Sequence, residues 1–517
     1  INFKGVNYNE VWHLLTKQQQ ITFDFFDLDA FDQTDELYVK MNARGKKLSN
    51  FENYKAWLLK KYSNKIDISE WNKKLDIQWH DLFWNANTEI TAEIDDVYLQ
   101  YFKNVFLGDY VLSFQTNDEI KGKSFDGLIK FSEESPITIF EEKAGLFNKN
   151  ITSYLQCLES ITNNVSVFEI IKVNQSYVKS SLFEFICKVN ENYNWWEATF
   201  FYAVYKYTIH NPTKLEENLQ DWVRISSNLI FNSAIDSPLR YKEACESINK
   251  VVENCKENPT HYFSEIKESD IRFFTLKQVK EEIQKAQLIK ENRDWKKVLI
   301  KYENHHYFYG QIGFIINLNE VIDIENFKTN ANKLANLFSK DNLKEIHLLN
   351  RLFLSYEECF VQRGSNLMFY SNDYGTVRVR NENWRIIFSD YSHILKEALK
   401  IESYEEHNLE KIISENRLKE HNSKSIDALI KFPYLFSYMH KRCLREHGKS
   451  LLLLSTSRIY GYHVELFTYI EHNLNKKNTE YIYGMNAVDW PKYKDVKNNI
   501  EYQYSLENDK VVPLKVN

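Results

Sequence analysis

Glycine and proline are scarce in this chain of 517 residues, which contains 13 glycines and seven prolines. Average proteins contain about 7% glycine and 5% proline, so both residues fall well below their usual shares. The shortage disfavours β-sandwiches, β-barrels and flexible linkers, because those structures depend on frequent turns. The composition therefore favours long helices, and the length is sufficient for about three domains of roughly 150 residues each.

Closely spaced cysteines are also absent. None of the six cysteines stands in a C-x-x-C pair, and their density is low for a disulfide scaffold. We therefore expect reduced, mostly buried thiols in a cytoplasmic protein, with no zinc or other metal site in this chain. The cysteines are Cys157, Cys187, Cys245, Cys255, Cys359 and Cys443.

Long apolar runs and a strong net charge are missing as well. The best apolar run, Leu451 to Leu454, is far shorter than the ~18 residues that a membrane span needs, so we expect no membrane partner. The net charge is −6, from 66 basic and 72 acidic side chains. No overall field draws such a protein to DNA, so any nucleic-acid contact must come from a local patch.

The clearest local signal is the stretch Thr34–Trp57, which predicts a helix, a tight turn and a second helix. Leu37, Tyr38 and Met41 have helical spacing, and Gly45 follows where a left-handed residue would end the first helix. The turn itself is Ala43–Lys47 and contains three cations.

The second helix is predicted to begin at Ser49. Ser49 and Glu52 form an S-x-x-E capping box, and Phe51, Tyr54 and Leu58 give the helix an apolar face. A glycine, cations and exposed N–H groups at a helix start are compatible with a contact with phosphate or nucleic acid. On the residues alone, a plain helix–helix turn whose lysines are solvated is favoured over such a contact.

The run ITFDFFDLDAFDQTDELYVKMNARGKKLSNFENYKAW resembles the segment with an N-x-R-G signature in the large prokaryotic family named for the N-terminal domain of GmrSD restriction endonucleases, which has a ParB-like fold. Four later blocks resemble successive parts of longer family members. They are LDIQWHDLFWN, EIDDVYLQYFKNVF, DWVRISSNLIFNSAIDSP and YFYGQIGFIINL. The resemblance would span nearly the whole chain and is strongest before Phe106.

The family's D-G-Q-Q-R signature should lie upstream of the N-x-R-G segment, and this chain lacks it. The run Gln18–Gln20 does not replace it, and the chain begins at Ile1 rather than Met. We therefore expect the larger C-terminal part of a longer protein, whose catalytic residues stay unassigned.

The resemblance implies an antiphage or restriction protein whose full-length form couples nucleotide binding or hydrolysis to DNA cleavage, with a nucleoside triphosphate and a divalent metal as its cofactors. In this chain it implies a nucleotide or phosphate site at Asn42, Arg44, Gly45 and Lys46. Arg44 would donate a bidentate pair to phosphate, Gly45 would allow close backbone approach and Asn42 would orient the turn. The competing expectation is a non-catalytic DNA- or protein-binding scaffold or sensor.

The predicted fold class is mainly α, a multi-helical body with a small β contribution at the N-terminus and a C-terminal β-hairpin. Residues 1–62 are expected to be the C-terminal part of a ParB-like domain, 63–290 a helical domain and 291–517 a second helical domain. Aromatic stripes at helical spacing are expected to be core faces. The stripes are Trp71, Leu75, Trp79, Leu82 and Phe83; Val97, Tyr101 and Val105; and Trp195, Thr199, Ala203 and Tyr207.

Four segments predict strands. Ile21–Leu28 alternates and belongs to the expected ParB-like sheet, and Thr376–Val379 follows turn residues. Residues 500–506 and 510–516 alternate on either side of a short polar turn, which predicts a terminal β-hairpin.

Other candidate chemistry is weaker. His305 and His306 are the best histidine pair, but adjacent side chains are expected to point in different directions, so structural histidines are favoured over a shared metal. Glu141–Lys143 matches a strand-borne E-x-K nuclease pattern only superficially. The basic run His440–Lys449 allows a DNA-backbone contact, although a solvated helix end stopping at Gly448 is favoured.

Overall fold

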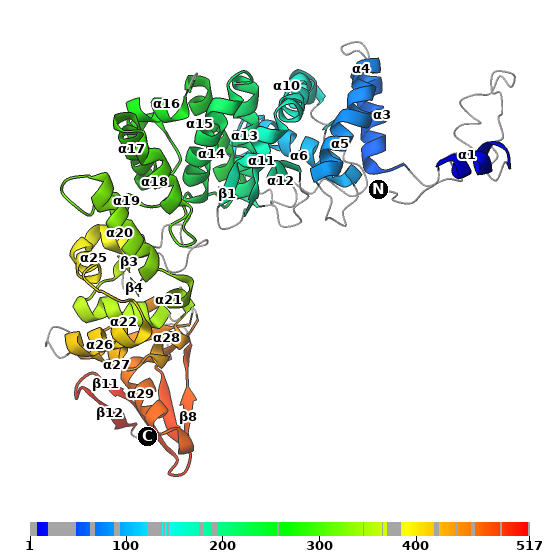
Figure 1. Cartoon of the computed structure of the whole chain (residues 1–517). Coiled ribbons are helices and arrows are strands. Elements are labelled where there is room, and N and C mark those ends of the chain that lie inside the picture. Colours follow the sequence, from blue (N-terminus) through cyan, green and yellow to red (C-terminus); the bar gives the residue numbers. More distant parts are fainter. Residues whose placement is uncertain are drawn as a thin grey trace. The chain divides into compact units, whose positions relative to one another are not determined.

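The chain is mainly α-helical, as predicted, with small antiparallel sheets (Figure 1). It falls into two compact units, residues 1–64 and 65–517. The computed structural model describes residues 8–18, 48–62, 68–86, 94–120, 137, 140–141, 144–174, 179–187, 194–255, 258–344, 346–363, 366–369, 384–417, 423–439, 443–455, 461–485 and 489–514.

The first unit contains the helices α1 (Tyr8–Thr16) and α3 (Asn50–Tyr62). The predicted capping box is confirmed at the start of α3: the N–H of Glu52 donates to Ser49 Oγ at 3.0 Å, and the N–H of Ser49 donates to Glu52 Oε2 at 2.6 Å. Phe51, Tyr54 and Leu58 are buried, which confirms the predicted apolar face.

The second unit begins with a series of helices. They are α4 (Ile68–Lys73), a π-helical turn (Lys74–Gln78), α5 (Trp79–Ala86), α6 (Ile94–Leu112), α7 (Asn117–Ile120), α10 (Ala144–Asn163), α11 (Val165–Ile170), α12 (Leu182–Cys187), α13 (Trp195–His210), α14 (Leu215–Phe231), α15 (Pro238–Asn254), α16 (Pro259–Glu265), a 3₁₀ turn (Glu268–Asp270), α17 (Leu276–Glu291) and α18 (Asp294–Glu303). A short hairpin, β1 (Lys172–Asn174) and β2 (Lys179–Ser181), lies between α11 and α12.

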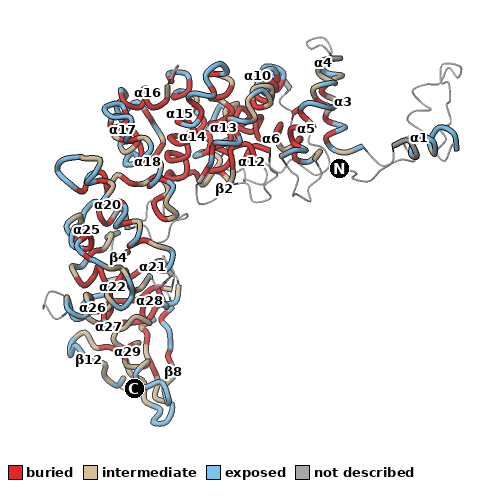
Figure 2. The backbone as a smooth tube through the Cα atoms, viewed as in Figure 1, coloured by how far each residue is buried: buried red, intermediate tan, exposed pale blue. Residues whose placement is uncertain are grey.

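Helix α13 is the centre of this helical region. Its predicted stripe is buried, but the side chains between the stripe positions are buried too, so α13 is enclosed on nearly all sides (Figure 2). Helices α6, α10, α14 and α15 pack against it. Asn194 starts the helix, because its side-chain oxygen accepts from the N–H groups of Trp196 and Glu197 at 3.0 and 3.1 Å.

The remaining helices come before and between groups of strands. The helices are α19 (Gly313–Ile316), α20 (Ile324–Leu337), α21 (Lys340–Lys344), α22 (Ile346–Tyr356), α24 (Trp384–Asp390), α25 (Ser392–Ala398), α26 (Glu406–Arg417), α27 (Lys424–Lys431), α28 (Tyr434–Tyr438), α29 (Leu466–Leu474) and a 3₁₀ turn (Lys476–Asn478). One core of buried side chains extends from Leu288 in α17 to Tyr493.

Two antiparallel sheets lie in the C-terminal part. The six-stranded sheet has the order β3-β4-β5-β6-β7-β9, and the four-stranded sheet has the order β12-β11-β10-β8. Their strands are β3 (Val361–Arg363), β4 (Asn366–Met368), β5 (Cys443–His447), β6 (Ser450–Leu454), β7 (Tyr462–Glu465), β8 (Thr479–Ile482), β9 (Gly484–Met485), β10 (Lys492–Asp495), β11 (Ile500–Ser505) and β12 (Lys510–Pro513). Strands β11 and β12 pair antiparallel, which confirms the predicted C-terminal hairpin.

The prediction of a helix end in the basic run was wrong. Residues 443–447 form strand β5, and Gly448, with φ of +61°, stands in the turn between β5 and β6. Strand β6 is the apolar run Leu451–Leu454 with Ser450, and all five residues are buried. A strand buried along its whole length needs partners on both edges, and β5 supplies one of them, so tertiary pairing overrides the local helical spacing.

Three further expectations concern strands, cysteines and membrane-spanning helices. The predicted strands Ile21–Leu28 and Thr376–Val379 lie outside the described residues. All six cysteines are buried, in line with the predicted burial of most of them. In the parts of the chain that the structure describes, no helix combines the length and the apolar character needed to span a bilayer.

Candidate functional site: a buried ion cluster and the turn before α3

The site residues predicted from the sequence, Asn42, Arg44, Gly45 and Lys46, lie outside the described residues. The structure describes the helix that follows them. Helix α3 begins at Asn50, and Leu48 and Ser49 separate it from the cationic turn in the sequence.

The capping box changes what this helix start can offer to a ligand. The N–H groups of Ser49 and Glu52 already donate to Glu52 and Ser49, and the Glu52 carboxylate places a negative charge beside the helix N-terminus. The expectation that exposed N–H groups of this helix start would hold phosphate therefore fails for these two groups. A phosphate contact here would therefore draw on the cations of the turn rather than on these two amides.

The structure brings together a group of charged and polar side chains, which we call the buried ion cluster: Arg224 and Asn228 on α14, Gln278, Glu281, Glu282 and Lys285 on α17, and Glu303 at the end of α18. Arg224 Nη1 lies 3.2 Å from Glu282 Oε2 and 3.0 Å from Glu303 Oε1. Lys285 Nζ lies 2.7, 2.8 and 2.9 Å from carboxylate oxygens of Glu281, Glu282 and Glu303.

The cluster is removed from solvent. The side chains of Lys285 and Glu282 are 0% exposed, and those of Glu303 and Arg224 are 3% and 8% exposed. Buried charges are strongly unfavourable unless they are paired and hydrogen-bonded. Two cations and three carboxylates thus hold three helices together, and each depends on the others.

Neutral donors complete the cluster. Asn228 Nδ2 donates to Glu282 Oε1 at 3.1 Å and to Glu303 Oε1 at 3.0 Å, and Gln278 Nε2 donates to Glu282 Oε1 at 3.0 Å. The carbonyl of Gly310 accepts from Lys285 Nζ at 2.6 Å. Gly310 has φ of +84°, and an added Cβ would lie 2.0 Å from Asn228 Oδ1, so only glycine fits there.

The cluster joins two of the sequence blocks quoted above. DWVRISSNLIFNSAIDSP supplies Arg224, Asn228 and Asn232, and YFYGQIGFIINL supplies Gly310 and Gln311. Asn232 Nδ2 donates to the Tyr309 carbonyl at 3.0 Å, and Gln311 Nε2 donates to Asn232 Oδ1 at 2.6 Å. Sequence reasoning singled out the blocks and missed the ion cluster between them.

Burial and pairing act in opposite directions on the ionisation of the cluster. Burial raises the pKa of Glu282 above its ordinary value, against the attraction of Lys285 and Arg224. Burial acts the same way on Glu303, but there Lys285 and Arg224 outweigh it and the pKa is lowered. Burial works against the charge of Lys285, yet Glu281, Glu282 and Glu303 raise its pKa.

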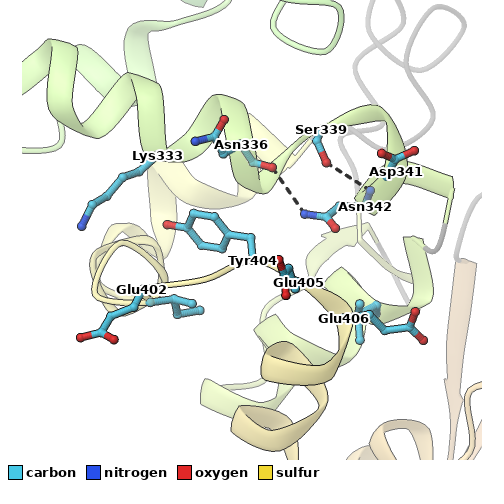
Figure 3. Close-up of a pocket in the computed structure, with 11 residues that line it drawn as sticks. Lys333, Asn336, Ser339, Asp341, Asn342, Glu402, Tyr404, Glu405 and Glu406 are labelled. Atoms are coloured by element: carbon cyan, nitrogen blue, oxygen red, sulfur yellow. Dashed lines mark hydrogen bonds between the residues drawn. The ribbon is translucent and has the colours of Figure 1, made fainter.

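A small cavity of about 150 Å³ lies against the cluster, and Arg224, Asn228 and Glu303 form part of its lining. A second hollow of about 670 Å³ lies between α20, α21 and the segment before α26 (Figure 3). It is lined by exposed side chains, including Lys333 and the acids Glu402, Glu405 and Glu406. Lys333 Nζ already donates to the Leu399 carbonyl at 2.7 Å, so this hollow has few buried groups that would select a ligand.

The other candidates from the sequence take ordinary positions. The rings of His305 and His306 have centroids 4.1 Å apart, so the expectation that they diverge was wrong. Phe140 and Glu141 are helical rather than extended, and the Glu141 side chain is exposed. Within the described residues, no group of three or more His, Cys, Asp or Glu side chains is placed to hold a metal ion.

The cysteine thiols are expected to have low nucleophilic reactivity. Burial raises the pKa of all six cysteines, to about 12 for Cys157 and about 11 for Cys443. Because the thiolate is the reactive form, these side chains behave as apolar core residues.

Comparison with known proteins adds no relative. No family model matches the chain, and neither the search of curated proteins nor the search of solved structures finds a match.

Proposed function

We propose that this chain is the helical body of a cytoplasmic, GmrSD-like antiphage or restriction protein. In this proposal the turn with Asn42, Arg44, Gly45 and Lys46 binds the phosphate of a nucleotide or nucleic acid, and the full-length protein couples nucleotide binding or hydrolysis to DNA cleavage. The resemblance carried by the N-x-R-G run and the L-S-x-F-E-N-x-K helix supports the family.

The observation that carries the proposal is the start of α3. The Ser49–Glu52 capping box starts α3 at Asn50, shortly after Lys47, and this helix carries the L-S-x-F-E-N-x-K element of the resemblance. The cap also occupies the N–H groups of Ser49 and Glu52, so in this proposal the cations of the turn, with Arg44 first among them, bind the phosphate. Arginine suits this role because its two parallel N–H groups match two phosphate oxygens.

Arg44→Ala in the 517-residue chain tests the proposal, with binding of a fluorescent nucleoside triphosphate and of a short DNA duplex as readouts. Loss of a charge-assisted hydrogen bond of about 1.5 to 3 kcal/mol would weaken binding by roughly 10- to 150-fold. The matched control is Arg293→Ala, which removes an exposed arginine from the second unit and should leave binding unchanged. Equal affinities of Arg44→Ala and the parent chain would overturn the proposal.

A non-catalytic scaffold or sensor is the second candidate. It is favoured by the ion cluster, whose charges face one another across α14, α17 and α18 and so stabilise the body rather than react. In that case the N-x-R-G turn braces the fold. Arg44→Ala would then lower the melting temperature and leave affinity unchanged, and the full-length protein would not hydrolyse nucleotide with or without DNA.

A further inference from the structure

Two turns lie side by side at one end of the four-stranded sheet. Residues 474–478 lead from the end of α29 into β8, and residues 496–499 join β10 to β11. Strands β8 and β10 pair antiparallel, and the N–H of Val496 donates to the Asn478 carbonyl at 2.8 Å. The two turns therefore form one surface, which we call the lysine tip.

The turn between β10 and β11 has a fixed backbone. The Asp495 carboxylate accepts from the N–H groups of Lys497 and Asn498 at 2.9 and 3.1 Å, and from the Asn498 side chain at 2.8 Å. Asn499 has φ of +55°, a left-handed conformation that asparagine adopts more easily than most residues. The Asp495 charge is thus used to hold the turn, and a ligand would not need to shape it.

The lysine tip is basic, although the whole chain is acidic. Its two turns include Lys476, Lys477 and Lys497 and no acid, whereas the chain has a net charge of −6. All three lysines are exposed, and none of them forms a salt bridge with another described residue. Their ammonium groups are therefore available to an anionic partner.

Two exposed aliphatic side chains accompany these lysines. Leu474 and Val496 are 63% and 59% exposed. Aliphatic groups gain free energy when they leave water, so a partner that covered both side chains would gain affinity. The tip contains no aromatic residue. Its exposed surface is therefore cationic and aliphatic.

An anionic bilayer surface suits both kinds of side chain. Lysines are attracted to anionic headgroups, and exposed aliphatic side chains enter the boundary between headgroups and acyl chains. A single-stranded nucleic acid would suit the lysines, but it is usually held by stacking on aromatic rings, which the tip lacks. The phosphates of a duplex would leave Leu474 and Val496 in water. The tip thus fits a bilayer better than a nucleic acid.

We propose that the lysine tip binds the surface of an anionic phospholipid bilayer. Lys476, Lys477 and Lys497 lie against the headgroups, and Leu474 and Val496 lie at the acyl boundary. This contact does not depend on the function proposed for the turn before α3. The sequence led us to expect no membrane partner because no apolar run could span a bilayer, but a surface contact needs no such run.

Co-sedimentation of the 517-residue chain with lipid vesicles tests the proposal. One set of vesicles contains phosphatidylcholine alone, and the other contains equal parts of phosphatidylcholine and phosphatidylglycerol. The chain should bind the anionic vesicles at least roughly tenfold more tightly, and added salt should weaken this binding. Equal binding to the two sets, or no binding to the anionic set, would overturn the proposal.

Two variants of the tip locate the binding. Changing Lys476, Lys477 and Lys497 together to glutamine should weaken binding to the anionic vesicles roughly 100-fold, because each lysine near an anionic surface contributes a factor of about five. Changing Leu474 and Val496 together to serine should also weaken this binding, because the acyl boundary then gains no aliphatic group. Unchanged vesicle affinity in the serine variant would contradict the proposed position of these two side chains.

The matched control changes three exposed lysines of other helices, Lys250, Lys277 and Lys297, to glutamine and should bind the vesicles like the parent chain. Substitutions at exposed positions seldom affect folding, and circular dichroism checks that both triple variants are folded. A folded tip variant with the vesicle affinity of the parent chain would overturn the proposal. A tip variant that loses affinity for a short DNA duplex but not for the vesicles would make the tip a nucleic-acid contact instead.

Discussion

At the residue scale, replacing each of two helical glycines by alanine is expected to have opposite effects on stability. An added Cβ at Gly108 in α6 would lie 2.1 Å from the Tyr202 ring, which is fully buried and has no room to move. At Gly145 in α10 the same Cβ would meet nothing within 4 Å. We predict that Gly108→Ala lowers the free energy of unfolding by about 1 to 3 kcal/mol through overpacking.

Gly145→Ala is the matched control for this prediction. Alanine favours a helix over glycine by up to about 1 kcal/mol, so this variant should be as stable as the parent chain or slightly more stable. Urea unfolding of the two variants measures both effects. Equal stability of the two would mean that α6 and α13 do not pack as closely as described.

Lys285 makes the second prediction at this scale. Its ammonium group is 0% exposed and balances carboxylates from two helices. Lys285→Met would leave Glu281, Glu282 and Glu303 facing one another with Arg224 as the remaining cation of the cluster. We predict a loss of about 3 to 5 kcal/mol in the free energy of unfolding, because removing one partner leaves buried charge uncompensated.

The control for Lys285→Met is Lys400→Ala, which removes an ion pair with Glu397 whose side chains are 69% and 48% exposed. An exposed pair of this kind contributes less than about 1 kcal/mol. Chemical denaturation compares the two, and a similar small loss for both would contradict the structural role of the cluster.

At the scale of single elements, the start of α3 predicts a local effect. Ser49→Ala removes the oxygen that accepts from the N–H of Glu52, a change that costs about 1 kcal/mol. We expect faster amide exchange in the first turn of α3, measured by hydrogen–deuterium exchange, and little change elsewhere. Asn50→Ala, an exposed neighbour, is the control and should leave exchange unchanged. Slow exchange in Ser49→Ala would show that other contacts hold this turn.

A buried histidine in strand β7 is expected to make the stability of the protein depend on pH. His463 is 4% exposed, and burial lowers its pKa below the ordinary value of 6.5. Below pH 6.5 the unfolded chain takes up the proton before the folded chain does, so this contribution to stability is present above that pH and is lost on acidification. We predict that the urea midpoint falls less between pH 7.5 and pH 5.5 in His463→Gln than in the parent chain.

The comparison of His463→Gln with the parent chain isolates the contribution of His463 for two reasons. Glu282 has a raised pKa and adds stability on acidification, but it is present in both proteins and cancels in their difference. His407→Gln, at an exposed position, is the control and should keep the parent dependence. The same pH dependence in His463→Gln and the parent chain would exclude His463 as its source.

The elements also show how far the sequence predicts the structure. The capping box of α3 and the terminal hairpin were predictable because both depend on neighbouring residues. Strand β5 was not, since Leu444 pairs with Leu453 of β6 and with Leu367 of β4, which is far away in the chain. Helical spacing of cations within 440–449 carried no information about those partners.

At the scale of the whole molecule, the ion cluster was hidden for the same reason. On α17, Glu281, Glu282 and Lys285 have the spacing of ordinary surface pairs, and the contacts with Arg224 and Glu303 are what identify Glu282 and Lys285 as buried. The predicted site was based on a resemblance in short local motifs. Its residues are Asn42, Arg44, Gly45 and Lys46. A buried cluster built from α17, α18 and the distant helix α14 has no such local signal.

The last prediction follows from the position of the cluster. It concerns the domain boundary that the sequence led us to expect at 290/291. A cut there separates Glu303 from Arg224 and Lys285 and removes Leu288 and Ile289 of α17 from the core that continues through α18. We therefore predict that residues 65–517 alone unfold in a single sharp transition like that of the parent chain, whereas 65–290 and 291–517 do not fold separately. Thermal unfolding followed by circular dichroism measures this for each fragment. Two soluble fragments with sharp transitions of their own would instead establish 290/291 as a true boundary and reduce the cluster to a contact between domains.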